Sequence, residues 1–216
     1  MTHDDPKLHW TINSAIVRKL LNQVQQSRGE KKAITVAPVG RRFIDDEAGL
    51  RFVLDQLSLL SDQERHLVVL EIGDAYFGSW PALAPRLAVI RRVCRKIGIR
   101  LSLDHREFQQ VAATGATIAG GDLLDHDWSE RQTLGALNAF AAGAATTALQ
   151  SSVSGLATSS MVIAAVCAGF DHLSGSAIGQ GNPLPLGVYP LSTEGFYLQH
   201  QAQRLQQERG TTGKGS

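Results

Sequence analysis

Cysteine is scarce in this 216-residue sequence, which holds Cys94 and Cys167 and no CxxC pair. This spacing excludes the usual zinc-binding and disulfide frameworks. Both cysteines lie in apolar stretches with helical spacing, so we expect two buried, free thiols. Free thiols are typical of a reducing compartment, and we therefore predict a cytoplasmic protein.

An excess of charge of one sign is also missing, because 21 lysines and arginines nearly cancel 20 aspartates and glutamates. The chain lacks the strong field that attracts nucleic acid or an anionic membrane, so we expect no nucleic-acid partner. Long apolar runs are absent as well. The most apolar stretch, residues 161–170, is about half as long as the ~20 residues that span a bilayer, and no charged-then-apolar leader follows Met1. We predict no membrane insertion.

Several motifs of cofactor chemistry are absent. The sequence contains no GxGxxG, Walker or GxSxG pattern. One cluster resembles a metal site and consists of Asp122, Asp125, His126 and Asp127. It directly precedes a capped helix, where acidic residues complement the helix dipole, so we interpret it as a solvated turn. We predict no cofactor.

The most informative stretch is LVVLEIGD, residues 67–74. It is too short for a helix and too apolar for a half-exposed strand, which indicates a strand buried on both faces of a parallel sheet. Glu71 interrupts the apolar run near its carboxyl end. Ligands bind at the carboxyl ends of strands in parallel β/α folds, so Glu71 is the first candidate site residue.

Helical and strand patterns alternate along the chain. Helical spacing covers residues 11–26, 45–60, 81–97, 107–113, 129–143, 156–168 and, as a polar helix, 193–209. Strand patterns cover residues 33–39, 67–74, 99–104, 114–119, 145–149 and 171–178, with a Gly120–Gly121 break after the fourth. The alternation predicts one α/β domain over residues 11–190, either a doubly wound sheet or an incomplete TIM-type barrel with six of eight strands. We expect a flexible N-terminus at residues 1–10, and a C-terminal helix and flexible tail at 191–216.

Basic residues mark one side of the third predicted helix. They are Arg86, Arg91, Arg92, Arg95, Lys96 and Arg100. We interpret them as a solvated face, with a docking surface for an acidic partner as the alternative.

Residues at the carboxyl ends of parallel strands face a common mouth. The predicted strand ends carry Ala37, Pro38, Glu71, Asp74, Asp104, His105, Gly120, Gly121, Gln150, Ser151 and Ser174. We select four of these as candidate ligand-binding residues, namely Glu71, Asp104, His105 and Gln150. Glu71 and Asp104 are the candidate metal ligands, but two carboxylates are few for a hard divalent cation. Asp104 or His105 could act as a general base, although hydrogen bonds to loop backbone are the interpretation that we favour.

Four stretches resemble strands of the EAL domain, a family of cyclic di-GMP phosphodiesterases with a modified TIM barrel. ITVAPVGRRFID (34–45) is similar to the family's L-S-V-N-L-S strand with its F-x-D helix start, and LVVLEI (67–72) to L-V-L-E-I-T-E. IGIRLSLDH (97–105) is similar to G-v-x-i-a-L-D-D, and GFDHLSG (169–175) to G-x-D-x-x-Q-G. The resemblance covers residues 11–180. It implies that Glu71 and Asp104 occupy positions of metal-binding or catalytic carboxylates.

Other family positions have changed. Against the family pattern, Ala37 replaces the metal-binding asparagine, His105 the second aspartate, and Ser174 the glutamine of Q-G-Y. The K-I-D strand corresponds to residues 119–122 without a lysine, and the E-G-V-E strand to residues 151–154. The chain has no counterpart of the first two family strands, which include the E-A-L tripeptide. Two-metal hydrolysis needs a cage of carboxylates, so we predict that the protein is not an active phosphodiesterase.

The resemblance therefore implies a degenerate, catalytically inactive EAL-like module that regulates bacterial cyclic di-GMP signalling through protein–protein contacts. A receptor that binds cyclic di-GMP without cleaving it is the first alternative, and an unrelated small-molecule enzyme using Glu71, Asp104 and His105 is the second. An incomplete barrel leaves strands 33–39 and 171–178 with unpaired edges. We expect a second copy of the chain, another protein or the segment from Gly179 onward to cover them.

Overall fold

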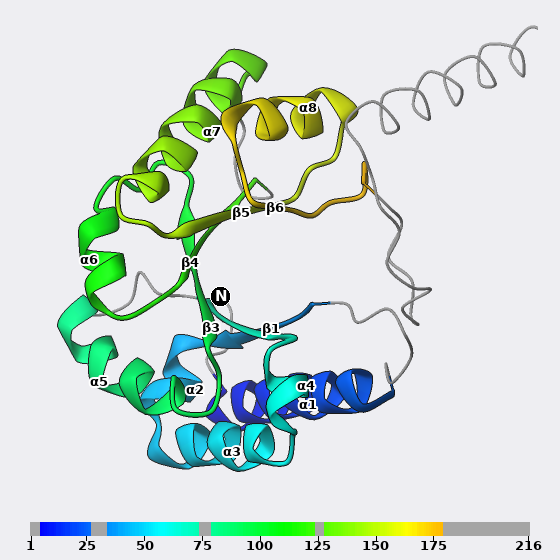
Figure 1. Ribbon diagram of the computed structural model, residues 1–216, viewed down its shortest axis with the longest axis vertical. Coiled ribbons are helices and arrows are strands. Elements are labelled where there is room, and N and C mark those ends of the chain that lie inside the picture. The colour runs from blue at the N-terminus through cyan, green and yellow to red at the C-terminus, as the bar shows by residue number, and fades with distance from the viewer. Residues whose placement is uncertain (1–4, 27–33, 74–78, 124–127, 179–216) are drawn as a thin grey trace, which may run out of the picture.

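Six parallel β-strands form one sheet in which each strand pairs with its neighbours in the chain. The computed structural model describes residues 5–26, 34–73, 79–123 and 128–178. Its strands are β1 (Thr35–Gly40), β2 (Val68–Gly73), β3 (Lys96–Ser102), β4 (Ile118–Asp122), β5 (Gln150–Ser154) and β6 (His172–Leu173). The sheet curls into half of a barrel, with β1 and β6 at its two ends (Figure 1). This confirms an α/β fold of the incomplete TIM-barrel type.

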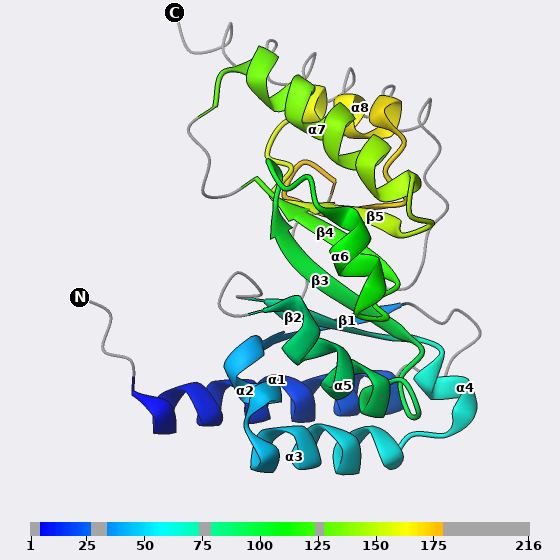
Figure 2. The ribbon, with the colours of Figure 1, turned by 90° about the vertical axis from the view of Figure 1, so that its left-hand side faces the viewer.

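The helices lie on the convex face of this sheet (Figure 2). They are α1 (Pro6–Gln26), α2 (Arg41–Asp45), α3 (Glu47–Ser58), α4 (Asp62–Arg65), α5 (Trp80–Ile90), α6 (Phe108–Ala113), α7 (Glu130–Ala145) and α8 (Ser159–Ala168). Helix α1 packs against β1 and α3, whereas α7 packs against α8 at the far end of the sheet. The concave face is left to carry the candidate site.

Strand β2 shows how the two faces differ. Val68, Leu70 and Ile72 are at most 1% exposed and belong to the core that the helices cover. Side chains alternate between the faces of a strand, so Val69 and Glu71 point to the concave side. Both line the groove there. The apolar run around Glu71 is therefore a buried strand, as its sequence predicts.

Helix starts follow the predicted caps. Ser79 precedes α5, and its hydroxyl accepts a hydrogen bond from the N–H of Ala82, with proline in the first helical turn. Ser129 and Gln132 form a capping box at the start of α7. Helix α1 begins earlier than predicted, at Pro6, because Asp5 accepts a hydrogen bond from the N–H of Lys7.

The predicted bounds of three strands, β3, β4 and β5, are wrong. The third predicted helix ends at Ile90, and Lys96–Ser102 forms β3, which places Lys96 and Ile97 in the sheet instead of the helix. Gly120 and Gly121 lie inside β4 instead of breaking the chain after it. The fifth strand is Gln150–Ser154, because residues up to Ala145 continue α7. Small residues such as glycine, alanine and serine carry little strand signal, which explains these shifts.

One of the two cysteines is buried as predicted, and the other is not. Cys94 is buried as expected, but Cys167 is exposed on α8. None of the helices in the described ranges combines the length and the apolar character that a membrane span requires. The predicted helix at 193–209 and the residues Asp125, His126 and Asp127 lie outside the described residues.

Candidate functional site

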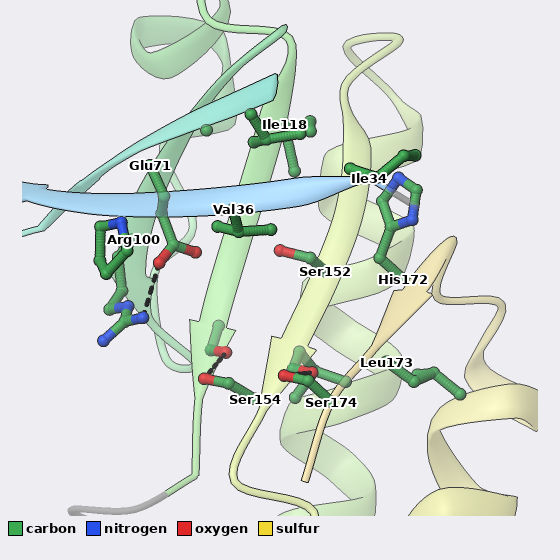
Figure 3. A pocket seen from close by; sticks show the side chains of 15 residues that line it. Ile34, Val36, Glu71, Arg100, Ile118, Ser152, Ser154, His172, Leu173 and Ser174 are labelled. Carbon is green, nitrogen blue, oxygen red and sulfur yellow. Dashed lines mark hydrogen bonds and ion pairs between the residues drawn. The ribbon is translucent and has the colours of Figure 1, made fainter. Parts of the chain in front are cut away.

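The concave face of the sheet holds a groove of about 430 Å³. Residues from all six strands line it, together with Ile34 and Ser174 beside them. Apolar side chains of β1 form one wall, while Ser152, Ser154 and His172 lie toward the other end of the sheet (Figure 3). A groove of this size with few polar groups has the dimensions of a small-molecule site.

Glu71 forms the tightest polar contact in the groove. The Nη2 atom of Arg100 lies 2.6 Å from its Oε2 atom (Figure 3). The Nη1 atom of Arg100 lies 3.5 Å from Oδ2 of Asp122, so one guanidinium contacts carboxylates from two other strands. The side chains of Glu71 and Asp122 are 14% and 20% exposed, and that of Arg100 is 38% exposed. A short contact between two charged groups, partly shielded from water, is a strong hydrogen bond.

Gly120 makes room for the Glu71 side chain, and Gly98 lies beside it. Glu71 pairs with Gly98 of β3, and a Cβ at Gly98 would lie 3.6 Å from the Glu71 Cγ. A Cβ at Gly120 of β4 would lie 3.1 Å from the Glu71 Oε1 and 2.9 Å from the Ser152 Oγ. The Glu71 side chain therefore lies across the sheet, over positions that carry no side chain.

Asp104 and His105 do not join Glu71. Asp104 is exposed in the turn after β3. The ring of His105 packs edge-on against Trp80 at 6.0 Å and against Phe108 at 5.3 Å, on the helical side of the chain. Its Nε2 atom is buried and has no hydrogen-bond partner among the described residues. Neither residue lines the groove.

Gln150 lies at the amino end of its strand, whereas the expected mouth is at the carboxyl ends. It is the first residue of β5 and pairs with Ile118, the first residue of β4. Ser154 is the true carboxyl end of this strand and lines the groove. Ser174 also lines it, as its predicted place at a strand end suggests.

In β1, the position that faces the groove is not the one that the family resemblance indicates. Ala37 is 1% exposed and lies in the core under the helices. Pro38 lines the groove and pairs with Glu71 in the sheet register. The concave position is therefore occupied by Pro38, which has no side-chain oxygen to offer a metal.

The donor set does not fit the metal ions that the EAL resemblance implies. Across the described residues, no three or more side chains of His, Cys, Asp or Glu gather where they could hold a metal ion. The two carboxylates on the concave face, from Glu71 and Asp122, are both in contact with Arg100. A hard divalent cation prefers about six oxygen ligands, which this face does not supply.

Arg100 and Asp122 are the site residues that the sequence analysis missed. A signal for Arg100 is present in KIGIRLS, where isoleucine and leucine alternate with Lys96, Gly98, Arg100 and Ser102. This period of two is typical of a strand with one polar face, and it places Arg100 beside Glu71. Arg100 also pairs in register with Gly120, in the strand where the resemblance expects a lysine.

Solved structures share this architecture. No protein-family model and no curated protein matches the sequence. The Bacillus subtilis YkuI protein, with an EAL domain and in complex with substrate c-di-GMP and calcium, is 14% identical with a TM-score of 0.71, over 98% of this chain and 53% of its own. The Xanthomonas citri FimX EAL domain, in complex with c-diGMP, is 15% identical with a TM-score of 0.64, over 86% of this chain and 74% of its own.

A third neighbour, the Vibrio cholerae LapD S helix-GGDEF-EAL protein, is 17% identical with a TM-score of 0.58, over 75% of this chain and 40% of its own. The chain thus spans about half of the YkuI chain and less of the LapD chain. What these neighbours share with it is the curved parallel sheet with helices on its outer face. The protein has the fold of an EAL domain, in an open form with six strands in the described residues.

Proposed function

We propose that this protein is a catalytically inactive EAL-like module of bacterial cyclic di-GMP signalling, which acts through protein–protein contacts. The observation that carries the proposal is the dispersal of the candidate ligands. Of Glu71, Asp104, His105 and Gln150, only Glu71 lines the groove. Hydrolysis of a phosphodiester by two metal ions requires several oxygen ligands around one point, and this arrangement does not supply them.

The open sheet supports the second half of the proposal. Ile34 and Val36 are 46% and 51% exposed at the β1 end of the groove. Large apolar side chains next to each other on a surface are typical of contact sites for another molecule. Among the described residues, β1 and β6 each pair with a single strand, so this side of the barrel is open to a partner.

The edges themselves are poorly suited to pairing with a further strand. Pro38 has no N–H to donate, and the N–H of Gly40 donates to the Asn13 Oδ1 at 2.7 Å. Strand β6 has only two residues. Short edges and edge prolines hinder the addition of strands, so we propose that the partner binds the side chains of the open face.

A direct assay tests the absence of catalysis. The purified protein is incubated at high concentration with cyclic di-GMP in Mg²⁺ or Mn²⁺ buffer, and products are separated by chromatography. We expect no linear dinucleotide above the buffer blank, while an active EAL domain run in parallel cleaves the substrate. Cleavage that disappears in Glu71→Gln would contradict the proposal.

A non-hydrolysing receptor for cyclic di-GMP is the second candidate function. The groove volume supports it, as does the complex of the FimX EAL domain with c-diGMP. Against it, the Arg100 guanidinium already contacts two carboxylates, those of Glu71 and Asp122, instead of being available to a phosphate. Titration calorimetry decides: micromolar or tighter binding would favour the receptor.

The small-molecule enzyme alternative needs Glu71, Asp104 and His105 to act together. Their positions separate them, since Glu71 lines the groove while the His105 ring packs against α5 and α6. We therefore do not propose this function.

A further inference from the structure

Three charged groups that meet on the concave face lie on consecutive strands. Glu71 comes from β2, Arg100 from β3 and Asp122 from β4, so the cation stands on the strand between the two anions. Each carboxylate is at most 20% exposed. Two neighbouring carboxylates that are partly shielded from water repel each other unless a cation lies between them.

Arg100 supplies the cation between these two carboxylates. Its Nη2 contact with Glu71, at 2.6 Å, is the close one, and its Nη1 contact with Asp122, at 3.5 Å, is the looser one. A guanidinium carries its charge at every physiological pH and offers a planar set of donors that matches carboxylates. We infer that Arg100 serves as a built-in cation, which bridges Glu71 and Asp122 in the place that a divalent metal ion would take between two carboxylates.

The inference has a consequence for metal dependence. A metal ion that entered the groove would have to displace the Arg100 guanidinium from Glu71 before it gained that carboxylate as a ligand. The described residues offer no third carboxylate, histidine or cysteine at this position to compensate for that loss. We therefore expect the contact of Arg100 with Glu71 and Asp122 to form without a divalent cation, whether or not the protein acts through protein partners.

Thermal unfolding of the full chain in EDTA, Mg²⁺ and Ca²⁺ tests this inference. For the wild type we expect the same Tm in all three buffers. Arg100→Gln should lower the Tm in EDTA, because it leaves the part-buried Glu71 carboxylate without the cation that contacts it, and millimolar Ca²⁺ should restore part of the loss. Arg92→Gln is the matched control, since Arg92 is exposed in the turn after α5. It should change neither the Tm nor its response to Ca²⁺.

A double variant keeps the test decisive if Arg100→Gln folds poorly. Glu71→Gln/Arg100→Gln removes one anion together with the cation, so it should have a higher Tm in EDTA than Arg100→Gln and should not respond to Ca²⁺. Each of three results would overturn the inference. They are a wild-type Tm that rises in Mg²⁺ or Ca²⁺, an Arg100→Gln variant that matches Arg92→Gln or gains nothing from Ca²⁺, and a double variant no more stable than the single one.

Discussion

Cys94 and Cys167 differ in environment although their sequence contexts are alike. Burial raises the pKa of the Cys94 thiol, and this effect exceeds the opposing one of its backbone hydrogen bonds. Because the thiolate is the reactive form, Cys94 should resist a thiol reagent at pH 8, whereas the exposed Cys167 should react quickly. Counting the thiols that react before and after unfolding checks this. A second fast thiol that persists in Cys167→Ser would contradict it.

The same pKa shift links the stability of the fold to alkaline pH. A thiol ionises at about pH 9 in the unfolded chain, and the folded state keeps the Cys94 proton to higher pH. Above that pH the folded state binds more protons than the unfolded state, so the free energy of unfolding falls as the pH rises. Urea titrations from pH 8 to 10.5 should show a steeper fall for the wild type than for Cys94→Ala. Parallel curves would contradict the expectation.

At the residue scale, Glu71 could be predicted and its environment could not. A carboxylate inside an apolar run is visible in the sequence because it breaks a strong pattern. Arg100 lies within the predicted strand at 99–104, but it continues the run of basic residues from the preceding helix, so it does not stand out as a partner of Glu71. Asp104 and His105 follow the carboxyl end of β3, but the chain turns after Ser102 and neither residue lines the groove.

At the scale of the strand, β4 depends on the absence of a side chain at Gly120. Gly120→Ala would place a Cβ 2.9 Å from the Ser152 Oγ and 3.1 Å from the Glu71 Oε1, so both groups would have to move. Because both atoms are ends of side chains, we expect a loss at the low end of overpacking costs, about 1 kcal/mol in the free energy of unfolding, measured by urea denaturation. Gly135→Ala is the control, because a Cβ there meets nothing within 4 Å in helix α7 and should stabilise by roughly 0.5–1 kcal/mol. Equal stability of Gly120→Ala and wild type would contradict this packing.

Helices and strands differed in how well the sequence predicted them. Ser79 and Ser129 mark helix starts through side-chain hydrogen bonds that are local in sequence, so these starts were predicted. IAGGD of β4 and QSSVS of β5 have weak strand propensity and become strands through pairing with distant neighbours. Only the resemblance to family strands indicated residues 119–122 and 151–154, because it uses chain order instead of local composition.

At the scale of the whole molecule, the exposed β1 wall predicts an assembly. The wild type should behave in light scattering as a homodimer, or should be recovered with a protein partner. Val36→Glu should remove that association, since it places a charge on the apolar wall. Leu59→Glu is the control, because Leu59 is 66% exposed at the end of α3 and does not line the groove. A monomer without any partner, or association unchanged in Val36→Glu, would count against the interaction module.

The order of the strands also bears on how the chain folds. In the described sheet every strand pairs only with the strand before it and the strand after it in the sequence, and β1 does not meet β6. A closed barrel must join its first strand to its last, which is the pairing with the longest loop to close and the greatest entropic cost. Without that closure, the sheet can grow from any βαβ unit. Each further strand is then added beside its neighbour in the chain, as in repeat proteins. The open barrel therefore lacks the strand pairing with the greatest sequence separation, and its sheet can form by the successive addition of βαβ units.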